Sequence, residues 1–275
     1  MLSRWYQVVK SVRAAPATRP RPPVNHVTGP AWTCFPERVS GPPRAMRRDY
    51  DSDPGRFLSA AELPQDDVHP HVAARLAGLG ARTVLDVGGG NGRLARLLPG
   101  LGLRCLLLDI SPAMLALAPR PAVCADGGRL PVAGGSVDAV AALYTLYHYE
   151  DPRQPVAEAR RVLRPGGTFV ACAPNRDSAP EIAHLVPDWG SASPFDGEDA
   201  AGVVASVFTA AAGDTVTVER WDGPIVTLTD AGHAAGFLRV HGLTPAAALA
   251  AAATLDLPLP LTMRGCFVYA VKGPA

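Results

Sequence analysis

Residues 83–98 read TVLDVGGGNGRLARLL, and they carry the clearest structural pattern in the sequence. A β-branched and leucine-containing run over 83–87 is broken by glycines in 88–92, and the following residues are apolar at helical spacing until Pro99-Gly100. The pattern predicts a strand, a glycine turn and a helix. Such a turn lets the backbone approach a ligand closely and directs free N–H groups toward it.

The same alternation extends outward from this stretch. Before it, a helix is expected at about 68–79, and after it strands at 104–109, 122–124, 137–143 and 168–173, with helices at 113–118 and 152–163. Strands that alternate with helices form a parallel sheet covered on both faces. Beyond Pro174 the pattern loosens into a loop over 175–196, helices at 197–212, 230–240 and 245–254, and strands at 215–221 and 266–271.

Charge is distributed unevenly along the chain. Residues 1–48 hold nine Lys/Arg, one acidic residue and eight prolines, which leaves 17 basic and 24 acidic residues for the rest of the 275. We interpret 1–48 as a Pro/Arg-rich, disordered arm and 49–275 as one folded domain. The folded part is net acidic, which argues against nucleic acid as its substrate. The chain has neither a secretory signal nor an apolar run long enough to span a membrane, so a cytoplasmic location is expected.

Three acidic residues stand at the ends of three successive predicted strands. Asp86 lies inside the end of the first strand, where it would repel a pyrophosphate but suit a cationic group such as a free amine. Asp109 ends the second strand, 23 residues later, where a carboxylate can accept both hydroxyls of a ribose. Asp126 follows the third strand and can accept a hydrogen bond from an exocyclic amine. Ribose, adenine and an amino acid together make S-adenosylmethionine.

At these residues the sequence resembles the class I S-adenosylmethionine-dependent methyltransferases, in particular the small-molecule group typified by ubiquinone/menaquinone methyltransferases. The matching stretches, in chain order, are 84–93, 108–115, 126–132, 136–140 with 146–152, and 160–167. The resemblance implies an α/β fold: a Rossmann-like, doubly wound, seven-stranded sheet with its last strand antiparallel and helices on both faces. It also implies S-adenosyl-L-methionine as the methyl donor.

The resemblance divides the folded part into four segments. Residues 49–80 would form an N-terminal lid and helix, 81–175 the cofactor-binding core, 176–262 a cover on the acceptor side, and 263–275 the last strand. The segment 176–262 carries no motif that indicates an acceptor.

The resemblance also implies which residues contact the methionine and ribose parts of the donor. Asp86, Gly88 and Gly90 would hold the methionine end. Asp109 would hold the ribose, and Ile110 would cover one face of the adenine.

The remaining contacts implied by the resemblance lie farther along the chain, with one exception. Asp126 would bind the adenine amine with Gly127 nearby, while Leu143 and Tyr144 would line the methyl donor beside the acceptor. Tyr50 is the candidate for a lid tyrosine that closes over the cofactor.

His148 follows the fourth predicted strand and is the best-placed candidate for a general base, because histidine titrates near neutral pH. A structural histidine that bonds the loop is an equal alternative. No metal site is expected, since the cysteines show no metal-binding spacing and read as reduced core residues: Cys34, Cys105, Cys124, Cys172 and Cys266.

The sequence therefore predicts a methyltransferase that acts on O, N or C of a small organic acceptor, with a natural product or quinone-like metabolite as first choice. Two alternatives remain open. One is an RNA methyltransferase that uses the basic arm for phosphate contacts, and the other is a non-catalytic S-adenosylmethionine-binding module. The oligomeric state and the identity of the acceptor have no signal in the sequence.

Overall fold

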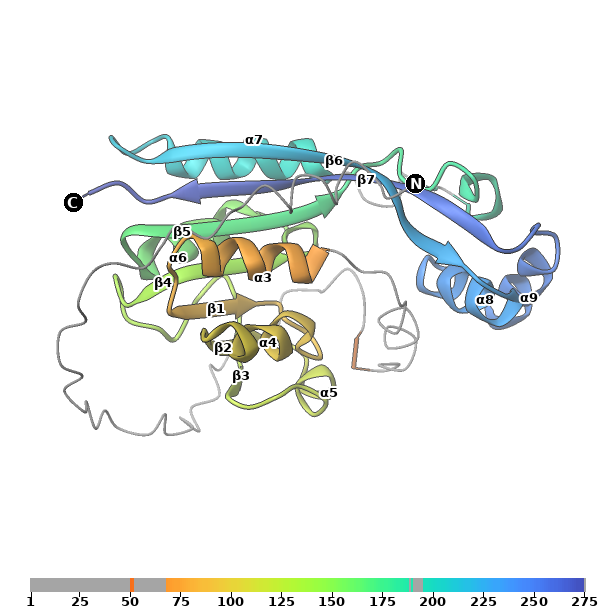
Figure 1. Ribbon diagram of the computed structural model, residues 1–275, viewed down its shortest axis with the longest axis horizontal. Coiled ribbons are helices and arrows are strands. Elements are labelled where there is room, and N and C mark those ends of the chain that lie inside the picture. The colour runs from red at the N-terminus through yellow and green to blue at the C-terminus, as the bar shows by residue number, and fades with distance from the viewer. Residues whose placement is uncertain (1–49, 52–67, 188, 190–194, 275) are drawn as a thin grey trace. The chain divides into compact units, whose positions relative to one another are not determined.

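The computed structural model describes residues 50–51, 68–187, 189 and 195–274, all of which belong to the compact unit Pro36–Ala275. Within these residues, seven strands form one mixed sheet in the order β3-β2-β1-β4-β5-β7-β6 (Figure 1). The strands are β1 (Thr83–Val87), β2 (Arg104–Asp109), β3 (Ala122–Cys124), β4 (Val137–Leu143), β5 (Leu163–Pro174), β6 (Thr215–Leu228) and β7 (Leu259–Val271). The predicted arm, 1–48, lies outside the described residues.

The first five strands run parallel, and β7 pairs antiparallel with both β5 and β6. Residues 139–143 of β4 and 169–173 of β5 are continuous apolar runs. Such runs are typical of strands at the centre of a sheet, where both faces are covered. The prediction of a doubly wound, seven-stranded sheet with an antiparallel last strand is therefore confirmed. Parallel pairing places the carboxyl ends of β1, β2, β3 and β4 along one edge of the sheet.

Helices cover both faces of the sheet. They are α3 (Val68–Gly78), α4 (Arg93–Leu97), α5 (Pro112–Leu115), α6 (Arg153–Val162), α7 (Gly197–Phe208), α8 (Ala231–Val240) and α9 (Pro245–Ala252). On one face, α6 and α7 bury Val156 and Phe208 in the core that contains Val268 of β7. The neighbouring residue, Phe267, points to the opposite face, where it stacks on His71 of α3 at 4.7 Å between ring centroids.

The β6–β7 hairpin is longer than the sequence indicated. The pairing of β5 with β7 ends at Pro174↔Gly265, but β6 and β7 continue to pair as far as Leu228↔Leu259. The extension could not be predicted from the sequence because it contains Pro224 and Pro260, and a proline within an apolar run argues against a central strand. The hairpin therefore projects beyond the carboxyl edge of the parallel strands, and β7 begins before residue 263, the predicted boundary.

The end of the hairpin carries a second hydrophobic core. We call this part the distal lobe: residues 178–187, Trp189 and 222–264. Helices α8 and α9 lie at the far end of the hairpin (Figure 1). The core between these helices and the hairpin contains side chains such as Ile182, Leu228, Phe237 and Leu261. Asp230 and Thr244 cap the two helices by accepting hydrogen bonds from backbone N–H groups in the first turn.

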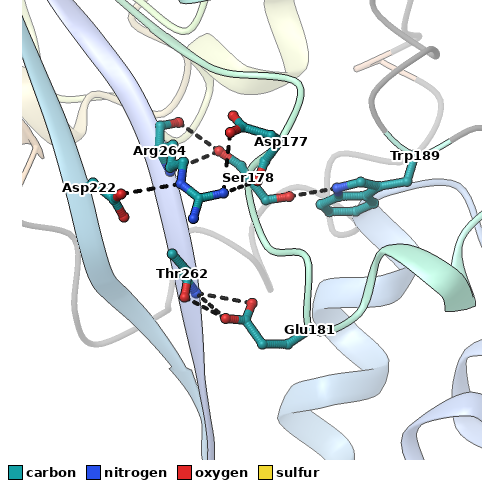
Figure 2. A network of polar contacts seen from close by, with 7 residues as sticks. All are labelled: Asp177, Ser178, Glu181, Trp189, Asp222, Thr262 and Arg264. Carbon is teal, nitrogen blue, oxygen red and sulfur yellow. Dashed lines mark hydrogen bonds and ion pairs between the residues drawn. The ribbon is translucent and has the colours of Figure 1, made fainter.

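A network of hydrogen bonds fastens the chain after β5 to the exposed edge of β7 (Figure 2). The Ala179 N–H donates to the Thr262 carbonyl at 2.7 Å, and the Thr262 N–H donates to the Glu181 carboxylate at 3.0 Å. The Ser178 hydroxyl donates to the Arg264 carbonyl at 2.6 Å. Residues 178–181 thus take the place of β5 beside the outer half of β7, and the network joins these two segments of the distal lobe.

Glu181→Ala should destabilise the distal lobe, because it leaves the Thr262 N–H and hydroxyl without their acceptor. We expect the free energy of unfolding to fall by about 1–3 kcal/mol, measured by urea denaturation. Glu181→Gln keeps an acceptor oxygen and should lose less. The comparison variant is Asp222→Ala, which removes only the exposed ion pair with Arg264 at 3.3 Å and should cost less than about 1 kcal/mol. Equal losses in Glu181→Ala and Asp222→Ala would show that the network does not fasten the lobe.

Candidate active site

A cavity of about 250 Å³ opens at the carboxyl edge of the sheet. It lies at the ends of β1 and β4, between which the direction of the strand order reverses, and ligands of doubly wound sheets bind at this point. Its walls come from the turn after β1, the ends of β2 and β3, the segment after β4, and Tyr50. The lining residues are Tyr50, Gly88–Asn91, Asp109, Ile110, Met114, Ala125–Gly127, Tyr144, Thr145, Tyr147–Asp151 and Gln154.

The glycine turn follows β1 and forms the floor of one end of the cavity. Gly88 and Gly90 have φ angles of 67° and 55°, which favour glycine. The expectation that the glycine amides point freely at a ligand is wrong. Gly88 and Gly89 both donate to the Leu108 carbonyl, at 2.8 and 3.2 Å, because the β1–β2 pairing continues past the end of β1. The turn therefore allows a ligand to approach the backbone closely, but its Gly88 and Gly89 N–H groups are not free to bind the ligand.

Asp86 lies directly beneath this turn and does not line the cavity. It is only 2% exposed, and a Cβ on Gly89 would lie 2.6 Å from its Oδ2 atom. That Oδ2 atom is buried without a hydrogen-bond partner. Burial, and then repulsion by the Asp109 carboxylate, raise the pKa of Asp86 to about 7. Asp86 is therefore a buried acid poised to ionise near neutral pH.

The raised pKa of Asp86 predicts that stability falls as the pH rises from 6 to 8. The folded chain retains the Asp86 proton up to about pH 7, whereas the unfolded chain releases it near pH 4, so deprotonation above pH 6 disfavours folding. We expect Asp86 to contribute a loss of about 1 kcal/mol of unfolding free energy over this interval. Urea denaturation at the two pH values measures the loss, and Asp86→Asn should lack it. An Asp86→Asn variant with the same pH dependence as the unsubstituted chain would contradict this assignment.

Asp109 joins the glycine turn to the helix that follows β2. Its Oδ2 atom accepts a hydrogen bond from the Gly90 N–H at 2.7 Å, and its Oδ1 atom accepts one from the Ser111 N–H at 2.9 Å. The Ser111 hydroxyl caps α5 and also donates to Asp51. Burial raises the pKa of Asp109, and the bonds from Ser111 and Gly90 oppose that shift. Asp51 and Asp109 thus connect the segment around Tyr50 to the turn.

Asp126 and Gly127 line the cavity after β3. The Asp126 carboxylate accepts a hydrogen bond from the Gly128 N–H at 2.8 Å, which fixes the turn. A Cβ on Gly127 would lie 2.4 Å from the Tyr149 hydroxyl and 2.6 Å from Val87, so only glycine fits there. Burial raises the pKa of Tyr149, and the Tyr149 hydroxyl therefore remains protonated at neutral pH.

Aromatic side chains form another part of the cavity lining. The Tyr50 hydroxyl is hydrogen-bonded to Nε2 of His148 at 2.9 Å, and the Tyr147 ring lies 4.5 Å from the His148 ring. Tyr144 also lines the cavity and has a φ angle of 55°, a conformation that costs a non-glycine residue about 1 kcal/mol or more. The kink at Tyr144 turns the chain at the end of β4 and directs Thr145 toward Gly88.

The cavity brings together nine of the eleven predicted site residues, and their roles stay predictions. The two that do not line it are Asp86, under the turn, and Leu143, which is buried at the end of β4. Sequence reasoning missed lining residues such as Asn91, Met114, Thr145, Tyr147 and Gln154. Asn91 and Tyr147 lie inside motifs that were identified, so the signal was present, whereas Gln154 on α6 gave none.

The described residues bring together no group of three or more His, Cys, Asp or Glu side chains that could hold a metal ion. Cys172 and Cys266 are buried as predicted, but Cys124, at the end of the outer strand β3, is exposed. In the described part of the chain, no helix has both the length and the apolar character needed to cross a membrane.

The fold is shared with solved structures. The YcgJ protein of Bacillus subtilis superimposes with a TM-score of 0.54 over 75% of this chain and 100% of its own, at 15% sequence identity. The sheet has the strand order and the antiparallel β7 of the class I methyltransferase fold, 3-2-1-4-5-7-6. The cavity lies between β1 and β4, where the strand order reverses.

Sequence comparison finds similarity to methyltransferases over part of the chain. The methyltransferase domain family matches residues 85–171. An uncharacterised methyltransferase of Mycobacterium tuberculosis is 35% identical over 44% of this chain and 51% of its own length. The ubiquinone/menaquinone biosynthesis C-methyltransferase of Acidiphilium cryptum is 31% identical over 52% of this chain and 64% of its own. The chain thus spans about half the length of the first curated relatives it matches. Residues 85–171 are therefore similar to the methyltransferase domain family.

Proposed function

We propose that this chain is an enzyme that transfers a methyl group from S-adenosylmethionine to an oxygen, nitrogen or carbon atom of a small organic acceptor. The observation that carries the proposal is one cavity that joins the glycine turn after β1 to Asp109 at the end of β2. The match of residues 85–171 to the methyltransferase domain family supports the same donor.

The residues at the cavity fit this donor. Each Asp109 oxygen accepts one backbone hydrogen bond and keeps a lone pair for a ribose hydroxyl. Ile110 offers an apolar surface for adenine, and Asp126 a carboxylate for its amine. The Asp86 carboxylate, buried beneath the turn, would favour a nearby amino group through its negative charge rather than by direct contact. When bound, the donor supplies a methyl group already activated by a positively charged sulfur.

The residues of this chain then have two tasks. The first is to hold the acceptor in line at about 3–3.5 Å from the methyl carbon and to exclude water. The second arises only when the acceptor atom carries a proton. His148 is the candidate to take that proton, and the hydrogen bond between the Tyr50 hydroxyl and His148 Nε2 orients its ring.

The acceptor is proposed to be a small metabolite, such as a natural product or a quinone-like compound. The similarity to the Acidiphilium C-methyltransferase supports a quinone-like acceptor. The proposed cover on the acceptor side is residues 176–262, and the position of the distal lobe beyond the carboxyl edge supports that role for its part of this range. Helix α7, in the same range, packs on a face of the sheet instead. None of the described residues of the distal lobe lines the cavity, so that role requires the acceptor to extend past the cavity wall.

Labelled methyl transfer tests the proposal directly. The full chain is incubated with methyl-labelled S-adenosylmethionine and metabolite extracts, and products are identified by mass. We expect one labelled low-molecular-weight product whose formation needs the native chain. Label that appears only in RNA would instead identify an RNA methyltransferase. Binding of the donor without any labelled product would identify a non-catalytic binding module.

His148→Ala tests the general base. With the acceptor found in this way, the variant should lower kcat by about a hundredfold and abolish the rise of kcat with pH, because proton transfer contributes about 10²–10⁴ to the rate. Tyr50→Phe keeps a ring beside His148 but removes the hydrogen bond, and it should lower kcat less. An unchanged kcat and pH profile in His148→Ala would leave His148 only a structural role in the loop.

A further inference from the structure

A tyrosine hydroxyl lies against the turn that follows β3. A Cβ on Gly127 would lie 2.4 Å from the Tyr149 hydroxyl oxygen and 3.4 Å from the ring carbon that carries it, so this hydroxyl packs directly on the Gly127 backbone. Tyr149, Gly127 and Asp126 all line the cavity. The Tyr149 hydroxyl therefore lies in the part of the cavity where Asp126 is proposed to bind the adenine amine.

The surroundings of this hydroxyl make it a hydrogen-bond donor. Burial, and then the Asp126 carboxylate, raise the pKa of Tyr149, while a hydrogen bond from the Gly127 N–H to the Tyr149 oxygen opposes the rise. A hydroxyl oxygen that accepts a backbone N–H directs its own proton away from that N–H. No hydrogen bond among the described residues uses the Tyr149 proton. It is therefore available to a ligand in the cavity.

Asp126 and Tyr149 thus offer an acceptor near a donor. The Asp126 Oδ1 atom accepts the Gly128 N–H at 2.8 Å, and the carboxylate keeps lone pairs for a ligand. Adenine has the complementary pattern, because its N6 amine donates while the ring nitrogens on either side of that amine, N1 and N7, accept. The Gly127 N–H is already directed at the Tyr149 oxygen, so the hydroxyl is the donor that faces the base.

We propose that Tyr149 donates its hydroxyl proton to the adenine ring nitrogen beside the amine, N1 or N7, while Asp126 accepts from the amine itself. The inference rests on the proposed function and adds to it a residue that selects the base of the methyl donor. Tyr149 acts here through direct contact with the donor and has no part in the transfer of the methyl group.

Tyr149→Phe removes the hydroxyl and keeps the ring against Gly127. In calorimetric titration of the full chain, we expect this variant to bind S-adenosylhomocysteine about three- to tenfold more weakly than the native chain, the effect of one neutral hydrogen bond. Tyr269→Phe is the matched control. It removes a buried hydroxyl that makes no hydrogen bond in the described part of the chain and does not line the cavity, so its affinity should equal that of the native chain. Thermal melting verifies that both variants are folded.

Analogues of S-adenosylhomocysteine in which C–H replaces one ring nitrogen identify the atom that is contacted. The native chain should bind either the 1-deaza or the 7-deaza analogue about three- to tenfold more weakly than the parent compound, and Tyr149→Phe should lose nothing further with that analogue. The 3-deaza analogue lacks a nitrogen remote from the amine and should bind the native chain like the parent.

The inference is overturned if Tyr149→Phe binds S-adenosylhomocysteine as tightly as the native chain does. It is also overturned if each deaza analogue weakens binding equally in the native chain and in Tyr149→Phe, or if only the 3-deaza analogue binds the native chain weakly. Failure of the native chain to bind S-adenosylhomocysteine at all would instead contradict the proposed function.

Discussion

Gly88→Ala should abolish binding of S-adenosylhomocysteine at concentrations that saturate the unsubstituted chain. Gly88 has a φ angle of 67°, and a Cβ there would lie 2.1 Å from the Thr145 hydroxyl oxygen and 2.7 Å from Thr145 Cβ. Thr145 is buried and cannot swing away, so the turn itself must move out of the cavity floor. Left-handed strain and overpacking each cost about 1–3 kcal/mol, which together predict a loss of about a hundredfold or more in affinity.

Two further variants test whether the affinity is lost through the contact with Thr145 or through a general loss of structure. Gly90 has a similar φ angle of 55°, but its Cβ would meet only the mobile end of Met114, at 3.3 Å. Gly90→Ala should therefore lose far less affinity than Gly88→Ala. Adding Thr145→Gly to Gly88→Ala removes the clash and should recover part of the loss. Calorimetry measures affinity, and thermal melting verifies that each variant is folded. Equal affinities in Gly88→Ala and Gly90→Ala would show that contact with Thr145 does not shape the site.

Asp109→Ala should weaken S-adenosylhomocysteine binding by at least about thirtyfold. The side chain is proposed to accept two ribose hydroxyls, and hydrogen bonds to a charged group contribute about 1.5–3 kcal/mol each. The variant also leaves the Gly90 and Ser111 N–H groups without their acceptor, at 2.7 and 2.9 Å in the native chain. The turn and the start of α5 should loosen together.

Asp109→Asn distinguishes the loss of the ribose hydrogen bonds from the loss of the hydrogen bonds to the backbone. The amide keeps the size of the side chain and one acceptor oxygen, so the chain should melt closer to the native temperature than Asp109→Ala does. It cannot accept two ribose hydroxyls while it also holds both backbone amides, so its affinity should still fall by about tenfold. Asp138→Asn is a control at the opposite end of the sheet, where Asp138 binds the Arg82 and Thr83 amides. If Asp138→Asn lowers affinity as much as Asp109→Asn, the loss reflects folding rather than ribose recognition.

Most of the fold and much of the site could be predicted because both depend on local sequence patterns. The run 83–92 determines its own strand and turn, and the acidic residues at strand ends converge because parallel strands end at one edge. A helix was expected at 113–118, and α5 begins at Pro112 with the Ser111 hydroxyl as its cap.

The features that could not be predicted depend on contacts between distant segments. The extended pairing of β6 with β7 is stabilised by the chain after β5, through Glu181 and Thr262, which are 81 residues apart. The hydrogen bond between Tyr50 and His148 joins residues 98 apart. Likewise, the glycine amides were predicted to be free, but the Leu108 carbonyl on the neighbouring strand accepts two of them. Pattern and spacing carry no information about such partners.

The cavity beside the glycine turn is proposed to bind S-adenosylmethionine, and calorimetric titration of the full chain with S-adenosylhomocysteine measures this binding. We expect saturable binding at one site per chain, with an affinity that weakens strongly in Asp109→Ala. No binding by the folded chain, or equal affinity in the native chain and in a folded Asp109→Ala variant, would contradict it.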